Sequence, residues 1–147
     1  MRLTVYTDYS LRLLMYIAMH QGKLCTIEEV SKAYNISKNH LMKVAHELGL
    51  KGFIEAVRGR GGGLRLAKPA SEIRVGDVVR MTEPDFTLVE CFDHQKNRCV
   101  ITPACRLISV IAEAERAFLL SLNRYTIAEM VVEPEKLKRL LIPTLEV

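Results

Sequence analysis

The chain has 147 residues, 49% of them hydrophobic, which excludes a disordered protein and fits one domain, or a small domain with a dimerising arm. No run of about 18 apolar residues occurs, and the N-terminus lacks the apolar stretch of a signal peptide, so we expect a cytoplasmic protein with no membrane partner. Residues 1–70 hold 11 Lys and Arg against 5 Asp and Glu, or +6, whereas residues 71–147 hold 10 against 12, or −2. An anionic polymer would therefore be drawn to the N-terminal half.

Three short helices are predicted in this basic half. Apolar residues spaced i, i+3, i+4, i+7 predict a first helix from Asp8 to His20, with Thr7 as its N-cap. The capping-box pattern of Thr26 and Glu29 begins a second helix, and Ser37 caps a third helix after a short turn. Two short helices joined by a tight turn are typical of a helix-turn-helix.

A β-hairpin with a basic tip is predicted after the third helix. Residues 53–57 and 64–67 have strand propensity, and the six residues between them combine two arginines with four glycines. A hairpin directly after a helix-turn-helix predicts a wing. The expected fold is therefore mainly α with a small β-hairpin wing.

The outer face of the third helix and the wing tip carry side chains suited to DNA. Asparagine can bind adenine through two hydrogen bonds, serine and histidine suit several bases, and lysines suit phosphates. Arginine between glycines can enter a narrow minor groove. An ordinary solvated helix face and a flexible glycine turn are the alternatives, but their combination with the basic charge favours double-stranded DNA. The candidate DNA-binding residues are Ser37, Lys38, Asn39, His40, Lys43, Arg58 and Arg60.

The second half is predicted to hold an irregular segment and a long helix. A short helix over 75–81 precedes a loop of mixed polarity over 85–102. Thr102 and Pro103 are typical of an N-cap and first helical residue, and the helix runs to about Asn123. Its two apolar stripes are wider than one small domain needs, so we expect it to pack against a partner helix. A further capping box at 126–129 begins a last short helix.

Three of the four cysteines, Cys91, Cys99 and Cys105, lie within fifteen positions. Their separations of seven and five residues match neither a zinc ribbon nor a ferredoxin. In a cytoplasmic chain such a group favours a metal site over a disulfide framework. Three thiolates can hold a cluster and leave one iron open to an oxygen, a nitrogen or a small oxidising or nitrosylating molecule. Scattered buried thiols are the alternative, which the polar neighbours disfavour.

Other titratable residues near these features have simpler interpretations. Cys105 is expected in the first turn of the long helix, where the helix dipole favours a thiolate. Cys25 is expected to be a core or partly buried thiol. His94 is a possible ligand, but we prefer a solvated loop histidine. Asp8 by itself reads as a helix-start acid that pairs with Arg12 one turn later.

Motifs spread over nearly the whole chain carry a family resemblance: residues 3–9, 37–43, 57–66, 76–80, 88–91 and 101–105. With these motifs the sequence resembles the iron–sulfur winged-helix repressor family that includes the NsrR and IscR regulators. It is most similar to the nitric-oxide-sensing members of that family.

The resemblance implies a homodimer whose long helices cross between subunits, and an iron–sulfur cluster, 4Fe–4S rather than 2Fe–2S, bound by Cys91, Cys99 and Cys105. In the nitric-oxide sensors an aspartate at the start of the first helix, from the other subunit, can be the fourth ligand, and Asp8 is the matching position. Regulators of cluster biogenesis use a histidine shortly after the third cysteine, and no histidine follows Cys105. The first cysteine gap is longer than the second, whereas some relatives have equal gaps.

The sequence thus predicts a nitric-oxide-sensing, cluster-dependent repressor that binds a pseudo-palindromic operator, and no enzyme, because it contains no catalytic dyad or substrate motif. The alternatives are a thiol-redox or zinc-responsive regulator without a cluster, and a regulator of cluster biogenesis. The expected domains are a winged helix-turn-helix (1–82), a cluster-binding loop (83–102), and a dimerisation helix with further C-terminal helices (103–147).

Overall fold

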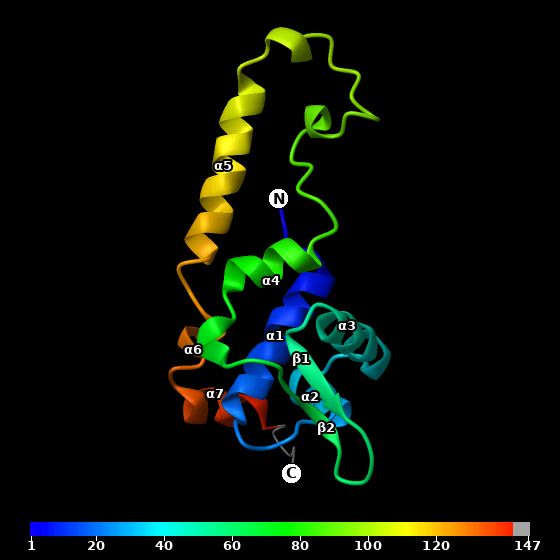
Figure 1. Cartoon of the computed structure of the whole chain (residues 1–147), viewed down its shortest axis with the longest axis vertical. Helices are drawn as coiled ribbons and strands as arrows, with labels where there is room; N and C mark the ends of the chain where they lie inside the picture. Colours follow the sequence, from blue (N-terminus) through cyan, green and yellow to red (C-terminus); the bar gives the residue numbers. More distant parts are fainter. Residues whose placement is uncertain (143–147) are drawn as a thin grey trace.

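The computed structural model describes residues 1–142, and its upper and lower parts look different (Figure 1). Helices and a hairpin gather in the lower part, from which one long helix rises as an arm that ends in the cysteine-bearing loop. The lower part contains α1 (Val5–Met19), α2 (Ile27–Tyr34), α3 (Lys38–Leu50), β1 (Ile54–Val57), β2 (Gly63–Leu66) and α4 (Val75–Thr82). The later helices are α5 (Leu107–Leu122), α6 (Ile127–Met130) and α7 (Pro134–Leu141), with single 3₁₀ turns at Ala70–Glu72, Glu90–Phe92 and Thr102–Ala104.

Helix α1 begins three residues earlier than its apolar periodicity predicts. Thr4 is the N-cap, and its hydroxyl accepts a hydrogen bond from the backbone N–H of Thr7 at 3.2 Å. The backbone N–H and hydroxyl of Thr4 both donate to one carboxylate oxygen of Glu83, at 2.7 and 3.0 Å. The prediction that Thr7 caps the helix was wrong: Thr7 is a fully buried residue of its first turn.

The helix-turn-helix forms where the capping residues predict it. Thr26 and Glu29 make both hydrogen bonds of the capping box at the start of α2. Asn35 ends that helix in the left-handed conformation (φ 53°), and Ser37 occupies the N-cap position of α3 without a capping hydrogen bond from its side chain. The inner face of α3 is buried in the core through Leu41, Val44 and Leu48.

The wing is an antiparallel hairpin in which Ile54 pairs with Leu66 and Val57 with Gly63. Its second strand also pairs with the loop after α1, because Leu64 and Cys25 exchange backbone hydrogen bonds of 2.7 and 3.0 Å. Two glycines of the tip have positive φ, and a Cβ on Gly62 would meet the carbonyl oxygens of Val57 and Gly59. The glycine run is therefore required by a tight turn rather than being only a flexible connection.

The fold prediction, mainly α with a hairpin wing, is confirmed, and one core serves the whole lower part. The core residues come from α1, α2, α3, the hairpin, α4 and α6, and the largest fully buried ones are Leu13, Leu14, Leu41, Leu48, Ile73, Ile127, Val30, Val78 and Val79. None of the described helices is long and apolar enough to cross a membrane.

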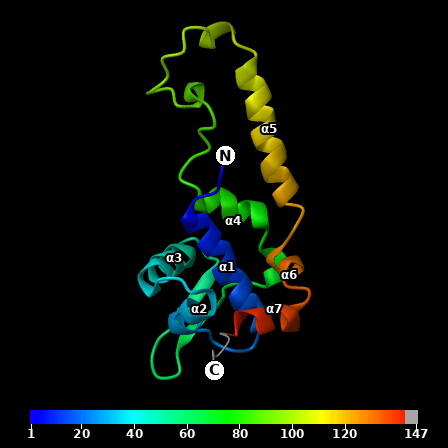
Figure 2. The same cartoon turned by 180° about the vertical axis from the view of Figure 1, so that it is seen from behind.

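Helix α5 is anchored to this core at its base and is exposed along most of its length (Figure 2). At the base, Asn123 donates to Asp77 at 3.0 Å, and Arg74 donates to the Asn123 carbonyl at 2.8 Å. The helix begins at Leu107, so the predicted start at Thr102 was wrong. Thr102–Ala104 form only a 3₁₀ turn, because Cys105 takes an extended conformation (φ −80°, ψ 120°) that separates it from α5.

Candidate DNA-binding surface and cysteine loop

The outer face of α3 is exposed as predicted, but its residues differ in their contacts. Ser37, Lys38, Asn39, His40 and Lys43 are all exposed. Lys38 lies 3.6 Å from a carboxylate oxygen of Glu28, and the ring of His40 lies 6.2 Å from that of Tyr9 on α1. The side chains of Ser37, Asn39 and Lys43 make no hydrogen bond or ion pair with the other described residues, so they are the freest to bind another molecule.

The wing tip extends the same side of the molecule. Arg58 and Arg60 are exposed in the turn between β1 and β2, whereas Arg65 on β2 is paired with Glu55 at 3.0 Å. Both views show the hairpin and α3 on one side and α5 on the other (Figures 1 and 2). The structure thus brings the predicted helix and wing residues to one basic side, where both could meet a duplex.

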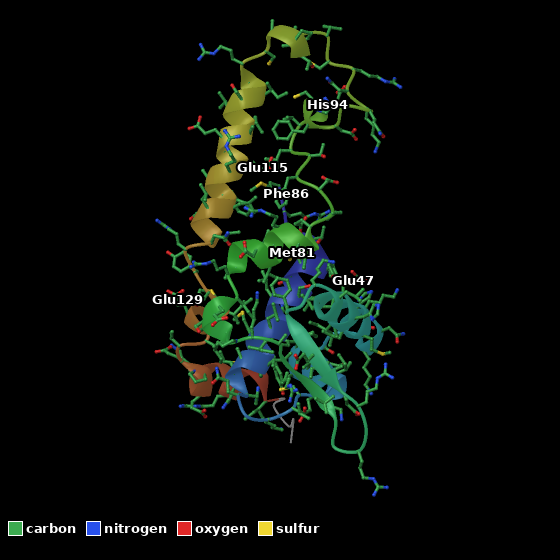
Figure 3. The ribbon with its side chains drawn as sticks, viewed as in Figure 1. Glu47, Met81, Phe86, His94, Glu115 and Glu129 are labelled. Carbon is green, nitrogen blue, oxygen red and sulfur yellow. The ribbon has the colours of Figure 1, made fainter. Side chains whose placement is uncertain are left out.

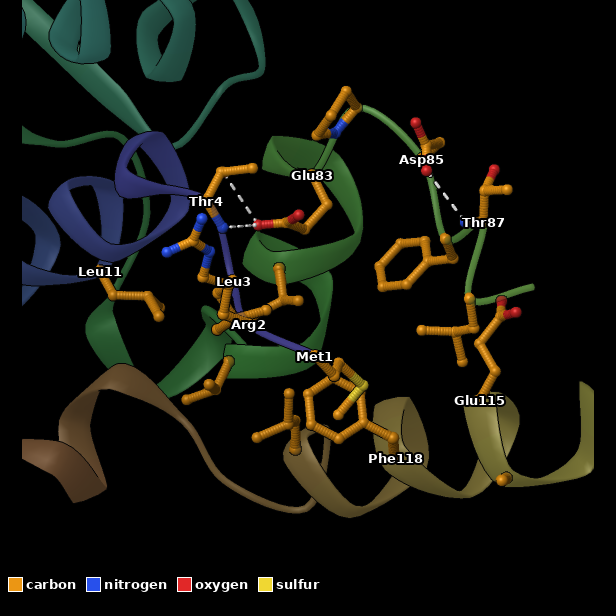
Figure 4. A pocket seen from close by; sticks show the side chains of 17 residues that line it. Met1, Arg2, Leu3, Thr4, Leu11, Glu83, Asp85, Thr87, Glu115 and Phe118 are labelled. Atoms are coloured by element: carbon orange, nitrogen blue, oxygen red, sulfur yellow. Dashed lines mark hydrogen bonds between the residues drawn. The ribbon is translucent and has the colours of Figure 1, made fainter. Parts of the chain in front are cut away.

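A chain of hydroxyl groups joins the start of the cysteine-bearing segment to α1, and Figure 4 shows its first link, the hydrogen bonds between Thr4 and Glu83. Glu83, the first residue after α4, accepts from Thr4, whose hydroxyl lies 3.1 Å from that of Thr7. The hydroxyl of Thr82 lies 2.9 Å from Thr7 and also donates to the Val78 carbonyl at 2.7 Å. Since α1 packs against both α3 and α4, these hydrogen bonds connect the loop to the helix that supports α3, the candidate DNA-reading helix.

The three clustered cysteines lie on one loop held together by its own hydrogen bonds. The N–H of Arg98 donates to the Glu90 carboxylate, which brings together the residues that precede Cys99 and Cys91. The N–H of Cys99 donates to the Asn97 side chain at 3.0 Å, and the Thr102 hydroxyl donates to the Cys99 carbonyl at 2.9 Å.

All three thiols of this loop are free, and none is in the hydrophobic core. Cys99 is exposed, and Cys91 and Cys105 are half-buried. Soft thiolate donors are the ligand type that an iron–sulfur cluster prefers, although within residues 1–142 the three thiols are not gathered into one metal-binding group. Cys105 is not in a helical turn, so the expected support from the helix dipole is absent.

Asp8 does not join the cysteines within one chain. Its carboxylate makes two hydrogen bonds with Arg12, at 3.0 and 2.8 Å, which confirms the expected ion pair. Within residues 1–142 no three potential metal ligands come together. The loop lies at the far end of the arm from the wing, and His94 is exposed on it (Figure 3). A fourth ligand from α1 would therefore have to come from another copy of the chain.

Cys25 differs from the other cysteines, as predicted. Its side chain is 1% exposed beneath the wing. Burial, with a smaller contribution from the charge of Glu29, raises the pKa of the Cys25 thiol to about 11, although Lys23 opposes the shift. This thiol is a core residue.

Sequence reasoning missed Glu83 and Gly76. Glu83 accepts a hydrogen bond from Thr4, the N-cap of α1, although the two residues are 79 positions apart in the sequence. No local sequence pattern predicts this contact. Gly76 is where the base of α5 meets α4, because an added Cβ would lie 2.7 Å from the Leu119 carbonyl oxygen. A glycine inside an otherwise helical pattern was the one available signal.

Comparison with known families and sequences finds transcriptional regulators in both cases. Residues 3–133 match the Rrf2 family, described as an iron-dependent transcriptional regulator. The HTH-type transcriptional regulator NsrR of Bacillus subtilis is 50% identical over 142 residues, covering 96% of this chain and 97% of its own. NsrR of Shouchella clausii is also 50% identical, covering 96% and 95%.

Solved structures show the same fold at lower identity. The oxidized form of Staphylococcus aureus CymR superimposes with a TM-score of 0.71 at 22% identity, covering 90% of this chain and 97% of its own. IscR of T. potens gives 0.70 at 22% identity, covering 92% and 90%.

Proposed function

Since the chain belongs to the Rrf2 family of iron-dependent transcriptional regulators and is itself a DNA-binding transcriptional regulator, we propose that it is a homodimeric repressor controlled by nitric oxide. It binds a pseudo-palindromic operator while an iron–sulfur cluster is in place and releases it when nitric oxide attacks the cluster. It acts in the cytoplasm and has no catalytic role. The observation that carries the proposal is the loop of three free thiols, outside the core, on a chain with a basic reading surface.

The DNA-binding part of the proposal assigns separate roles to helix and wing. Asn39, near the N-terminus of α3, would bind a base edge in the major groove, with Ser37 and His40 beside it. Lys38 and Lys43 would bind phosphates and fix the register of the protein on the duplex. Arg58 and Arg60 would enter the adjacent minor groove.

The dimeric part rests on the exposed apolar side chains of the arm. Leu107, Val110 and Leu120 of α5 are 58%, 57% and 66% exposed, and Val100 and Ile101 of the loop are also exposed. Apolar residues in such number along one helix are typical of a surface that is covered in an assembly. A crossing of two such helices would bring the loop of one subunit toward α1 of the other.

The sensing part of the proposal depends on whether Asp8 binds the partner's cluster or pairs with Arg12. When bound, the cluster would supply an iron without a cysteine ligand, a position open to nitric oxide. Cys91, Cys99 and Cys105 would hold it, as 4Fe–4S rather than 2Fe–2S, and the partner's Asp8 would complete the site. Asp8 would then leave Arg12, and without the cluster it would return to the pair seen here. Because α1 packs on α3, this exchange can shift the recognition helix and spoil the spacing of the two half-sites, about one DNA turn.

Metal analysis and a gel shift test this proposal. Protein purified without oxygen should be brown, contain iron and sulfide rather than zinc, and bind its operator more tightly than the same protein after chelation. Zinc without sulfide would favour the zinc-responsive alternative. A colourless, metal-free protein that binds equally well before and after chelation would favour thiol-redox control and contradict the proposal.

A further inference from the structure

Four exposed residues of α3 form one continuous stripe on the side opposite its buried face. They follow i, i+3, i+4, i+7 and so lie within about 100° of one another around the helix axis. The stripe consists of Asn39, Met42, Lys43 and His46. The opposite side consists of the buried Leu41, Val44 and Leu48.

The stripe is the part of α3 that no other described element engages. The two exposed residues beside it, Lys38 and His40, are directed toward α2 and α1 by their contacts with Glu28 and Tyr9. In residues 1–142 no stripe side chain makes a hydrogen bond or ion pair. These four side chains are therefore the ones that α3 presents to DNA when its outer face enters the major groove, with the long side chain of Lys43 reaching a phosphate.

Met42 is the apolar member of this stripe and is 57% exposed. It lies in the second turn of α3, one turn after Asn39, at a depth where side chains reach base edges. The major groove offers one prominent apolar group, the C5-methyl of thymine, whereas the other base edges there present hydrogen-bond donors and acceptors, which a thioether, a weak acceptor and no donor, satisfies poorly.

We propose that Met42 is a specificity-determining residue that contacts the C5-methyl group of one thymine in each operator half-site. The contact removes apolar surface of both partners from water, which favours thymine over cytosine at that position. Asn39, one turn earlier, reads a neighbouring base of the same half-site. The proposal rests on the DNA-binding function above and is independent of the cluster type.

Single exposed apolar residues are common on protein surfaces, so exposure does not by itself mark a DNA contact. The chain offers a matched comparison on the same helix: Leu50, its last residue, is 70% exposed and lies outside the stripe. If exposure were the only relevant property, Leu50 and Met42 would behave alike toward DNA.

Thymine-to-uracil replacement tests the contact, because it removes only the C5-methyl group. The anaerobic full-length dimer first selects its preferred site from a random duplex library. Each thymine of that site is then replaced by uracil, and affinities are measured for the wild type, M42A, M42L and L50A. Replacement of the contacted thymine in one half-site should weaken wild-type binding about fourfold, the factor that burial of one methyl group provides, and replacement in both half-sites should weaken it about fifteenfold.

The variants should separate a methyl contact from a general loss of binding. M42A, which removes the contact in both subunits, should bind the thymine duplex about as weakly as the wild type binds the duplex with uracil in both half-sites, and should lose little more on uracil. M42L, which keeps an apolar side chain, should retain part of the discrimination, and L50A should retain all of it. K43A should weaken binding to every duplex alike, as expected for a phosphate contact.

Two results would overturn the proposal: a wild type insensitive to uracil at every position, or an M42A variant as sensitive as the wild type at each of them. A wild type that selects no site at all would contradict the proposed function itself, and this reading with it.

Discussion

The lower part of the molecule (residues 5–82 together with α6) and the arm with its loop (residues 83–122) differ in how many of their side chains are buried. Every helix of the lower part contributes side chains to a common core. In α5, by contrast, Leu119 is the one buried residue of sixteen. The lower part is thus held together by its own packing, whereas the arm leaves apolar side chains exposed, and the cysteines that we propose as cluster ligands lie on the arm. Each prediction below tests one side of this difference.

The largest effect is expected from removal of a cysteine on the arm. C99S should lose nearly all bound iron and sulfide, because three thiolates are needed to hold the cluster, while the melting temperature of the apo protein stays unchanged. C25A provides the control: it lies in the core, so it should keep the iron and lower the stability. Equal iron content in C99S and the wild type would show that Cys99 does not bind the cluster.

Alkylation should separate the same two regions. Because burial keeps the pKa of Cys25 near 11, its thiolate fraction at pH 8 is about a hundredfold below that of an ordinary thiol. In the native apo protein iodoacetamide should modify Cys91, Cys99 and Cys105 while Cys25 stays unmodified until urea is added, as mass spectrometry would show. Early labelling of Cys25 would mean that the region beneath the wing is open.

Added side-chain volume at Gly76, where α4 meets the base of α5, should destabilise the protein. G76A places a Cβ 2.7 Å from the Leu119 carbonyl and against Asn123, so the free energy of unfolding in urea should fall by about 2–3 kcal/mol. G49A is the matched control: it is also helical, and its nearest neighbour lies 3.9 Å away. It should be neutral or stabilise by up to about 1 kcal/mol. Similar losses for both variants would contradict the close junction.

A substitution in the wing should weaken DNA binding and should not change cluster binding. R60A should lower operator affinity about tenfold and reduce the slope of binding against salt by about one. R116A, which removes an exposed arginine from α5, should change neither quantity. Equal behaviour of the two variants in fluorescence anisotropy would mean that the wing does not touch DNA.

The smallest effect is expected at Glu83, where the loop segment begins. E83A removes the acceptor of two hydrogen bonds from Thr4 and should lower the free energy of unfolding by about 1 kcal/mol. E83Q keeps an acceptor oxygen and should lose less. A neutral E83A would show that this contact does not hold α1 to the segment.

Local signals were sufficient for most of the lower part. The capping box at Thr26, the buried face of α3 and the glycine-rich hairpin could all be predicted, because each depends on residues close in sequence. The start of α1 could not, because Thr4 is held by Glu83 from a distant part of the chain. The start of α5 could not either, because Thr102 and Pro103 suit a short 3₁₀ turn as well as a helix, and the conformation of Cys105 decides between them.

The candidate sites differ in the same way. The candidate DNA-binding residues follow from helical spacing in α3 and from the hairpin pattern, and they are exposed as predicted. The ligand roles of Cys91, Cys99, Cys105 and Asp8 remain predictions, because a site shared between subunits does not form in one chain. The domain boundaries also remain predictions. Residues 143–147 of the predicted C-terminal region lie outside the described residues.

A single titration tests the central claim most directly. The anaerobic dimer is bound to fluorescent operator DNA, nitric oxide is added in steps, and cluster absorbance and DNA anisotropy are read from the same sample. Our account predicts that DNA is released in proportion to the loss of cluster absorbance. Complete loss of the cluster signal with the DNA still bound at unchanged affinity would contradict it.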